Sequence, residues 1–236
     1  KKDYIADLEK EIASYNVKVI YKKANIANAE NRKTIINELK QIKNIRIKFF
    51  IHSIAFGTLK KMISGDDYLN NKNIEMTSDV MCNSLVYWSQ DLYDNQLLKK
   101  GSHILSMTSA GGRKNWDNYG AISIAKAGLE SAMRQLAIEL APSGISSNAI
   151  QAGTTDTEAL RKIPGFEKMI ETSINNNPHK KLTTPSDIAE FITLLINYIW
   201  ELIIFSELEF QLADANLTEN INVADIVMII NYIIYN

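Results

Sequence analysis

Residues 103–129 read HILSMTSAGGRKNWDNYGAISIAKAGL, and this stretch contains the alternation that indicates the fold. The segment His103 to Met107 predicts a strand, which opens into the glycine-containing segment 109–112. From Tyr119 to Leu140 the apolar residues recur on one side of a long amphipathic helix, and Pro142 and Gly144 end it. A strand followed by a helix is the repeating unit of α/β proteins.

The alternation continues on both sides of this stretch. The pattern predicts further strands at 17–21, 45–54 and 145–150, and helices at 3–15, around 35–42 and at 79–100, with polar loop and broken helix at 57–75. Because the strands are apolar on both faces, we expect a mostly parallel, doubly wound, Rossmann-like α/β fold. Ligands bind beyond the carboxyl ends of the strands in such folds. The segments to inspect first are therefore 25–26, 52–56, 109–112 and 153–157.

The composition of the chain indicates which binding partners and which cellular compartment to expect. A formal net charge of −1 gives no global basic field, so nucleic acid is not an expected partner. Cys82 is the single cysteine, which rules out an internal disulfide and favours a reducing compartment such as the cytoplasm. The apolar stretch 188–205 carries Glu190 and Glu201 and is interpreted as a buried helix, not a membrane span. The chain begins without methionine, which suggests a fragment.

Tyr119 and Lys126 are the first candidates for chemistry. They are seven positions apart on the predicted helix and so lie two turns apart on one face. A phenol can protonate a developing oxyanion, and a nearby ammonium favours the phenolate form of a tyrosine. Ser109, at the end of the preceding strand, is placed to supply a second hydrogen bond to the same oxygen. Taken alone, a tyrosine and a lysine at this spacing also occur by chance in many helices.

The surrounding sequence makes the pattern specific. Ser109-Ala-Gly-Gly, ten positions to Tyr119, then Ala-Lys126-Ala-Gly-Leu-Glu and Asn148-Ala-Ile-Gln-Ala-Gly153, closely resemble the short-chain dehydrogenase/reductase family over about residues 5–195. The six residues between Tyr119 and Lys126, and the segment Ile51-His52-Ser53-Ile54-Ala55-Phe56, are similar to its enoyl-acyl-carrier-protein reductase branch. The resemblance implies that NADH or NADPH reduces an enoyl thioester on acyl carrier protein in fatty-acid biosynthesis, in a homo-oligomer.

The same resemblance implies roles for individual residues. Tyr119 would donate to the thioester carbonyl, Lys126 would hold the nicotinamide ribose hydroxyls and tune Tyr119, and Ser109 occupies the position of a second active-site residue. Asn83 is either part of a proton relay or an ordinary polar helix residue. Residues 156–176 resemble lid helices that cover an acyl chain, with the candidate apolar contacts Leu160, Ile163 and Phe166.

Cofactor contacts are also implied by the resemblance. Ser53, Ile54 and Ala55 would pass under the adenine ribose, and Asn25 and Ile26 would flank the adenine ring. The segment from Gly153 through Thr155 to Thr157 resembles the one that holds the nicotinamide amide, with Thr157 as the hydroxyl donor. A simple turn before a helix is the alternative interpretation of this segment.

Both ends of the chain depart from the family pattern. The family begins with a strand and a glycine-rich turn that binds the pyrophosphate, whereas the first glycine here is Gly57. We therefore divide the chain into an incomplete Rossmann-like reductase domain, 1–195, and a helical tail, 196–236. Within the tail, 214–225 resembles one calcium-binding repeat of a dockerin module, with Asp214, Asn216 and Asp225 as ligands. Because Thr218 and Glu219 replace a carboxylate and a glycine, a helix-capping loop explains this segment equally well.

Two alternatives to the enoyl reductase remain open. The first is another member of the same family that acts on a ketone or an alcohol, although the six-residue gap between Tyr119 and Lys126 weighs against it. The second is an inactive remnant whose tail binds another protein, a hypothesis based on the missing glycine-rich turn.

Overall fold

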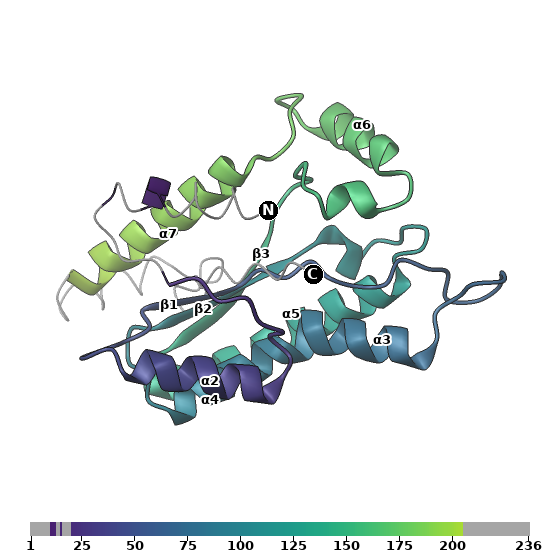
Figure 1. Cartoon of the computed structure of the whole chain (residues 1–236). Helices are drawn as coiled ribbons and strands as arrows, with labels where there is room; N and C mark the ends of the chain where they lie inside the picture. Colours follow the sequence, from purple (N-terminus) through teal and green to yellow (C-terminus); the bar gives the residue numbers. More distant parts are fainter. Residues whose placement is uncertain (1–9, 13–14, 16–19, 205–236) are drawn as a thin grey trace.

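A computed structural model of the chain describes residues 10–12, 15 and 20–204. Its centre is a sheet of three parallel strands in the order β1 (Phe49–His52), β2 (His103–Thr108) and β3 (Ser146–Gln151) (Figure 1). Phe49 pairs with His103, and His103 pairs with Ser146, so the three strands begin level with one another. Their carboxyl ends therefore meet at one edge of the sheet. The predicted parallel α/β fold is confirmed.

Helices cover both faces of the sheet (Figure 1). One face carries α2 (Ala29–Lys40), α3 (Asn71–Ser78), α4 (Ser84–Asp94) and α5 (Gly120–Leu140), and the other carries α7 (Pro185–Ile204). Side chains alternate along the strands as expected for period-2 geometry. Phe50 and Ile104 join the core beneath α2, α4 and α5, whereas Ile51 and Leu105 pack against Ile192 of α7. This double cover is the reason why the strands are apolar on both faces.

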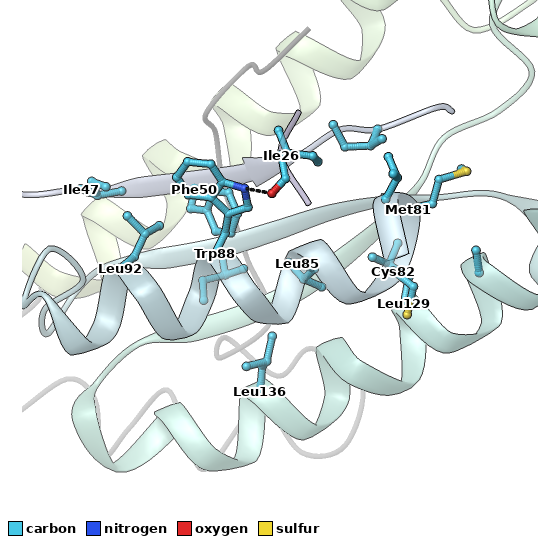
Figure 2. Close-up of a cluster of buried hydrophobic side chains, with 14 of the residues drawn as sticks. Ile26, Ile47, Phe50, Met81, Cys82, Leu85, Trp88, Leu92, Leu129 and Leu136 are labelled. Carbon is cyan, nitrogen blue, oxygen red and sulfur yellow. Dashed lines mark hydrogen bonds between the residues drawn. The ribbon is translucent and has the colours of Figure 1, made fainter. Parts of the chain in front are cut away.

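The larger of the two cores lies between the sheet and helices α4 and α5 (Figure 2). Leu85, Leu92 and Leu129 are fully buried there. Trp88 Nε1 donates to the Ile26 carbonyl at 3.1 Å, which fastens the extended segment before α2 onto α4. A buried indole N–H without a partner would be costly, so this bond satisfies the one polar group of the side chain.

The helix predicted at 79–100 differs from the observed one. Helix α3 already begins at Asn71, where Asn70 and Asn73 form a reciprocal capping box. A π-helical turn, η1 (Asp79–Asn83), joins α3 to α4, and α4 ends at Asp94. The chain leaves the helix through Gln96, whose φ of 57° is left-handed. Cys82, in the π-helical turn, is buried against α5, where a methyl group on Gly128 would collide with its sulfur.

The remaining short elements connect the layers. Three 3₁₀ turns, η2 (Ala110–Gly112), η3 (Ala141–Ser143) and η4 (Leu160–Lys162), precede or follow the strands and helices, and α6 (Phe166–Asn176) follows η4. The strand predicted at 45–54 is shorter than expected because the Ile47 N–H bonds to the Leu97 carbonyl, outside the ladder. Residues 20–25 form no strand, and residues 17–19 of the strand predicted there lie outside the described residues.

Helix α7 begins at Pro185, three residues before the apolar stretch 188–205, and runs past residue 195. The Thr184 hydroxyl accepts from the Asp187 N–H, and the Asp187 carboxylate accepts from the Thr184 N–H, which caps the helix reciprocally. No helix in the described part of the chain is both long and apolar enough to cross a bilayer. Asp214, Asn216 and Asp225, the predicted calcium ligands, lie outside the described residues, and the domain boundary at 195 stays a prediction.

Helix α5 offers a matched test of the packing. Leu129 is fully buried beneath α4, whereas Ile138 on the same helix is 71% exposed. We expect Leu129→Ala to lower the free energy of unfolding by about 2–5 kcal/mol, because it leaves a cavity in the core. The control Ile138→Ala should change it by less than about 0.5 kcal/mol. Urea unfolding of both variants measures this, and equal effects would contradict the described packing.

Candidate functional site

A cavity of about 660 Å³ lies at the carboxyl edge of the sheet. Each of the three strands contributes the residues that follow it, and α5 and α6 close the sides. This is the place where parallel α/β sheets bind ligands. Among the residues that line it are Ser53, Ile54, Ala55, Met107, Thr108, Ser109, Gly111, Tyr119, Lys126, Gly153 and Thr155.

Tyr119 is buried at the start of α5, and its hydroxyl oxygen lies 3.4 Å from Ser109 Oγ. Ser109 Oγ also accepts from the Gly111 N–H at 3.1 Å, so the serine hydrogen is available to the tyrosine or to a ligand. A Cβ at Gly111 would collide with the Tyr119 ring. Asn118, with a left-handed φ of 61°, turns the chain into the helix. The glycine in the sequence motif therefore makes room for the phenol.

Lys126 is only 5% exposed although it carries an ammonium group. Its Nζ donates to the Met107 carbonyl at 2.6 Å and to the Ile54 carbonyl at 3.2 Å. Burial lowers the pKa of Lys126 to about 8, and the nearby Cys82 thiol offsets a part of that effect. An ammonium has three N–H donors, so these two bonds leave one for a ligand in the cavity.

Glu130 lies one helical turn after Lys126 and is also buried. Thr108 Oγ1 donates to it at 2.8 Å, and Arg113 donates through Nη2 at 2.9 Å and through Nε at 3.3 Å. Burial by itself raises the pKa of Glu130, but the bonds from Arg113 and Thr108, with the charges of Arg113 and Arg134, outweigh it and hold that pKa below its ordinary value. The sequence reasoning missed Glu130, and its one signal was the i, i+4 spacing from Lys126.

His52, at the end of β1, is buried against Ser84 with Nε2 2.7 Å from the serine Oγ. Ser84 Oγ donates its hydrogen to the Val80 carbonyl at 2.7 Å, so it accepts from a protonated His52 Nε2. Nδ1 then carries no proton, and it makes no hydrogen bond to the described residues. Burial and, secondly, the Lys126 charge lower the pKa of His52 to about 3, although its own backbone raises it in part. His52 is therefore neutral at physiological pH.

Some of the predicted cofactor residues line the cavity, and others do not. Ser53, Ile54, Ala55, Gly153 and Thr155 line the cavity together with the three predicted catalytic residues. Asn25, Ile26 and Thr157 do not line it, and neither does Asn83, the candidate for a proton relay.

Three of the residues outside the cavity make hydrogen bonds to other parts of the protein. Asn25 Oδ1 accepts from the Ala27 N–H, the Ile26 carbonyl accepts from Trp88, and Thr157 Oγ1 accepts from the Leu160 N–H. Of the predicted lid contacts, Leu160 and Ile163 line the cavity, while Phe166 packs against the main core.

The parallel sheet and the serine, tyrosine and lysine at its carboxyl edge define a Rossmann-like protein of the short-chain dehydrogenase/reductase class. The family model described as "Enoyl-(Acyl carrier protein) reductase" matches residues 2–203, and the chain belongs to this family. Both the class and the branch expected from the sequence motifs are thereby confirmed at the level of the family.

Individual relatives agree with this assignment. The chain is 31% identical over 146 residues to enoyl-[acyl-carrier-protein] reductase [NADH] of Buchnera aphidicola, a match that covers 62% of this chain and 56% of that protein. It is 25% identical over 172 residues to the [NADPH] enzyme of Staphylococcus aureus, covering 72% and 66%.

Solved structures agree as well. The crystal structure of the NADH enzyme from Aquifex aeolicus superimposes with a TM-score of 0.67 at 25% identity and covers 78% of this chain and 70% of that one. The alignments span 55–66% of the length of the curated relatives, so this chain matches only a part of each of them.

The buried His52 predicts how stability depends on acid. Its pKa in the fold, about 3, is below the ordinary value of 6.5, so the unfolded chain takes up the proton first. The stability of the wild type should therefore fall as the pH drops from 6.5 toward 3, by about 1.4 kcal/mol per pH unit for this group.

A variant that cannot titrate isolates this contribution. His52→Asn lacks the imidazole, so the stability difference between wild type and variant should shrink by the same slope below pH 6.5 and stay constant above it. Urea unfolding at pH 7.5, 6, 5 and 4 measures this. Two parallel stability curves would show that His52 titrates normally in the folded chain.

Proposed function

We propose that the chain is an enoyl reductase, which uses NADH or NADPH to reduce the double bond of an enoyl thioester carried by acyl carrier protein. The observation that carries the proposal is the meeting of Tyr119, Lys126 and Ser109 in one cavity at the carboxyl edge of the sheet. The relatives, which include both NADH and NADPH enzymes, support the reaction and leave both cofactors as candidates. Assembly as a homo-oligomer is part of the same proposal.

The cavity fits the nicotinamide half of the cofactor. Lys126 has an N–H donor left for ribose hydroxyls, and the backbone segments 53–55 and 153–155 border the same space. Its volume, about 660 Å³, is in the range of small-molecule sites. Asn25 and Ile26, which were predicted to flank the adenine, do not border it, so the proposal assigns the described residues to the nicotinamide ribose and amide.

When bound, the nicotinamide supplies the hydride that adds to the β-carbon of the enoyl group. The protein has to stabilise the negative charge that then develops on the thioester oxygen. Tyr119 donates a hydrogen bond to this oxygen from its hydroxyl, and Ser109, 3.4 Å from that hydroxyl, is close enough to donate a second. The charge of Lys126 favours negative charge in the same space. Tyr119 and Lys126 are themselves buried, and surroundings with little solvent strengthen each of these interactions.

A carbonyl reductase of the same family is the second candidate. The proximity of Ser109 and Tyr119 favours it, because two hydroxyl donors directed at one oxygen also suit a ketone that is reduced to an alcohol. The two candidates differ in the bond that receives the hydride. Crotonyl and acetoacetyl thioesters, compared as substrates with the same chain, distinguish them.

Removal of the Tyr119 hydroxyl tests the proposed reaction. The wild-type chain should oxidise NADH or NADPH in the presence of a crotonyl thioester, followed at 340 nm. Tyr119→Phe should lower kcat by about 10²–10³-fold with little change in cofactor affinity, because one donor to the developing oxyanion is lost. Tyr93→Phe, an exposed tyrosine on α4, is the matched control and should keep full activity. Undiminished turnover in Tyr119→Phe would remove this residue from the mechanism.

The lowered pKa of Lys126 predicts a pH dependence of activity. The ammonium is present below a pKa of about 8 and is lost as the pH rises through that value. Values of kcat/KM should therefore decline above about pH 8, and Lys126→Met should show a low and flat profile over the same range. Steady-state rates between pH 6.5 and 9.5 measure this. A wild-type profile that stays level to pH 9.5 would contradict a charged role for Lys126.

A further inference from the structure

We propose that Glu130 is a positioning residue, which holds the first part of the loop 109–119, the turn 109–112, by both of its ends and thereby aims the Ser109 hydroxyl at Tyr119. We name Glu130, Thr108 and Arg113 the carboxylate clamp. The effect of the clamp on turnover rests on the proposed function, whereas its effect on the loop does not.

The contacts of Glu130 bracket the loop. Thr108, the last residue of β2, immediately precedes Ser109, and its hydroxyl donates to Oε1 of Glu130. Arg113 follows the turn η2, and its guanidinium donates to Oε2. Each carboxylate oxygen therefore binds a different end of the turn that contains Ser109 and Gly111. The Glu130 side chain on α5 therefore fixes the residues immediately before and after this turn.

The helix that carries Glu130, α5, also positions the catalytic candidates Tyr119 and Lys126. Tyr119 is the N-cap residue of α5, and Lys126 lies one turn before Glu130. Ser123, between them, donates from Oγ to the Gly111 carbonyl at 2.5 Å. The turn is therefore tied to α5 at three points, and the distance of 3.4 Å between the Ser109 and Tyr119 hydroxyls depends on those ties. Loss of these ties would therefore move the Ser109 donor, although Glu130 itself does not line the cavity.

The position requires a charged carboxylate. The Glu130 side chain is 9% exposed, whereas the Arg113 side chain is 73% exposed, so the arginine reaches in from the surface to a buried acceptor. A buried carboxylate without donors is strongly unfavourable. The ionised Glu130 side chain is therefore stable in this position only while Thr108 and Arg113 both donate to it. An amide at this position keeps an acceptor for Thr108 and loses the charge that holds Arg113. Glu130→Gln therefore opens the arginine arm of the clamp with little change in side-chain volume.

The experiment compares Glu130→Gln with Glu139→Gln. Glu139 is an exposed glutamate on the same helix, and its carboxylate contacts only Gln135 among the described residues, so this variant is the matched control. The first measurement is limited digestion with trypsin under native conditions, with the cleaved bonds identified by mass spectrometry. Trypsin cuts after Arg113 and Lys114, which lie in the loop itself. The second measurement is the steady-state rate with a crotonyl thioester and NADH or NADPH.

We expect cleavage after Arg113 and Lys114 to be about tenfold faster in Glu130→Gln than in Glu139→Gln, the factor for the loss of a hydrogen bond to a charged group. Cleavage after the buried-core lysines and arginines should not change. We also expect kcat to fall by about ten- to hundredfold, because the Ser109 donor is displaced, with KM for the cofactor within about twofold. This split between kcat and KM would not follow from a purely structural role.

Three results would overturn the proposal. Equal cleavage of both variants in the loop would show that Glu130 does not hold it. Accelerated cleavage at every site in parallel would assign Glu130 to global stability. Faster loop cleavage with unchanged kcat would separate the loop from catalysis. If the wild type itself showed no turnover, the enoyl reductase proposal would fail, and the cleavage pattern would still decide whether the clamp exists.

Discussion

The ammonium group of Lys126 lies between two main-chain carbonyls, one in a strand and one in the segment that follows another strand. The Met107 carbonyl is part of β2, and the Ile54 carbonyl lies two residues beyond the end of β1, so one side chain from α5 joins the carboxyl ends of both strands to the helix. A charge in so little solvent is tolerable because strong acceptors replace water. Lys126 also lines the cavity, so its remaining donor is available to a ligand there. The position of the helix, the spread of the strand ends and the shape of the site all depend on this contact.

The groups around Lys126 respond to its charge. His52 is kept neutral by burial and by this ammonium, and its hydrogen bond to Ser84 holds the end of β1 against the start of α4. Glu130 supplies a negative charge one turn further along α5, but its carboxylate is directed to Thr108 and Arg113. Lys126 and Glu130 therefore bind different parts of the protein, although both lie on the same face of α5. The ammonium organises strand ends, and the carboxylate organises the loop between β2 and α5.

Sequence reasoning predicted the elements whose cause is local. The parallel sheet follows from strands that are apolar on both faces, and the meeting of Tyr119, Lys126 and Ser109 follows from helical spacing after a strand end. Contacts between residues far apart in the sequence were not predicted. Nothing near Lys126 in the sequence identifies Ile54 as its partner, and nothing near Glu130 identifies Arg113. The π-helical turn at Asp79–Asn83 was not predicted either; it joins α3 to α4 and packs on α5, which is far away in the sequence.

The contact between Cys82 and Gly128 has a consequence for how the molecule opens. The sulfur is enclosed where the π-helical turn meets α5, and no larger residue than glycine fits opposite it. A thiol reagent in solution can reach this atom only when the two segments separate. Since Cys82 is the single cysteine of the chain, its rate of chemical labelling reports the opening of this one seam, undisturbed by any other sulfhydryl. The labelling rate of Cys82 therefore measures local opening of the core without any added label site.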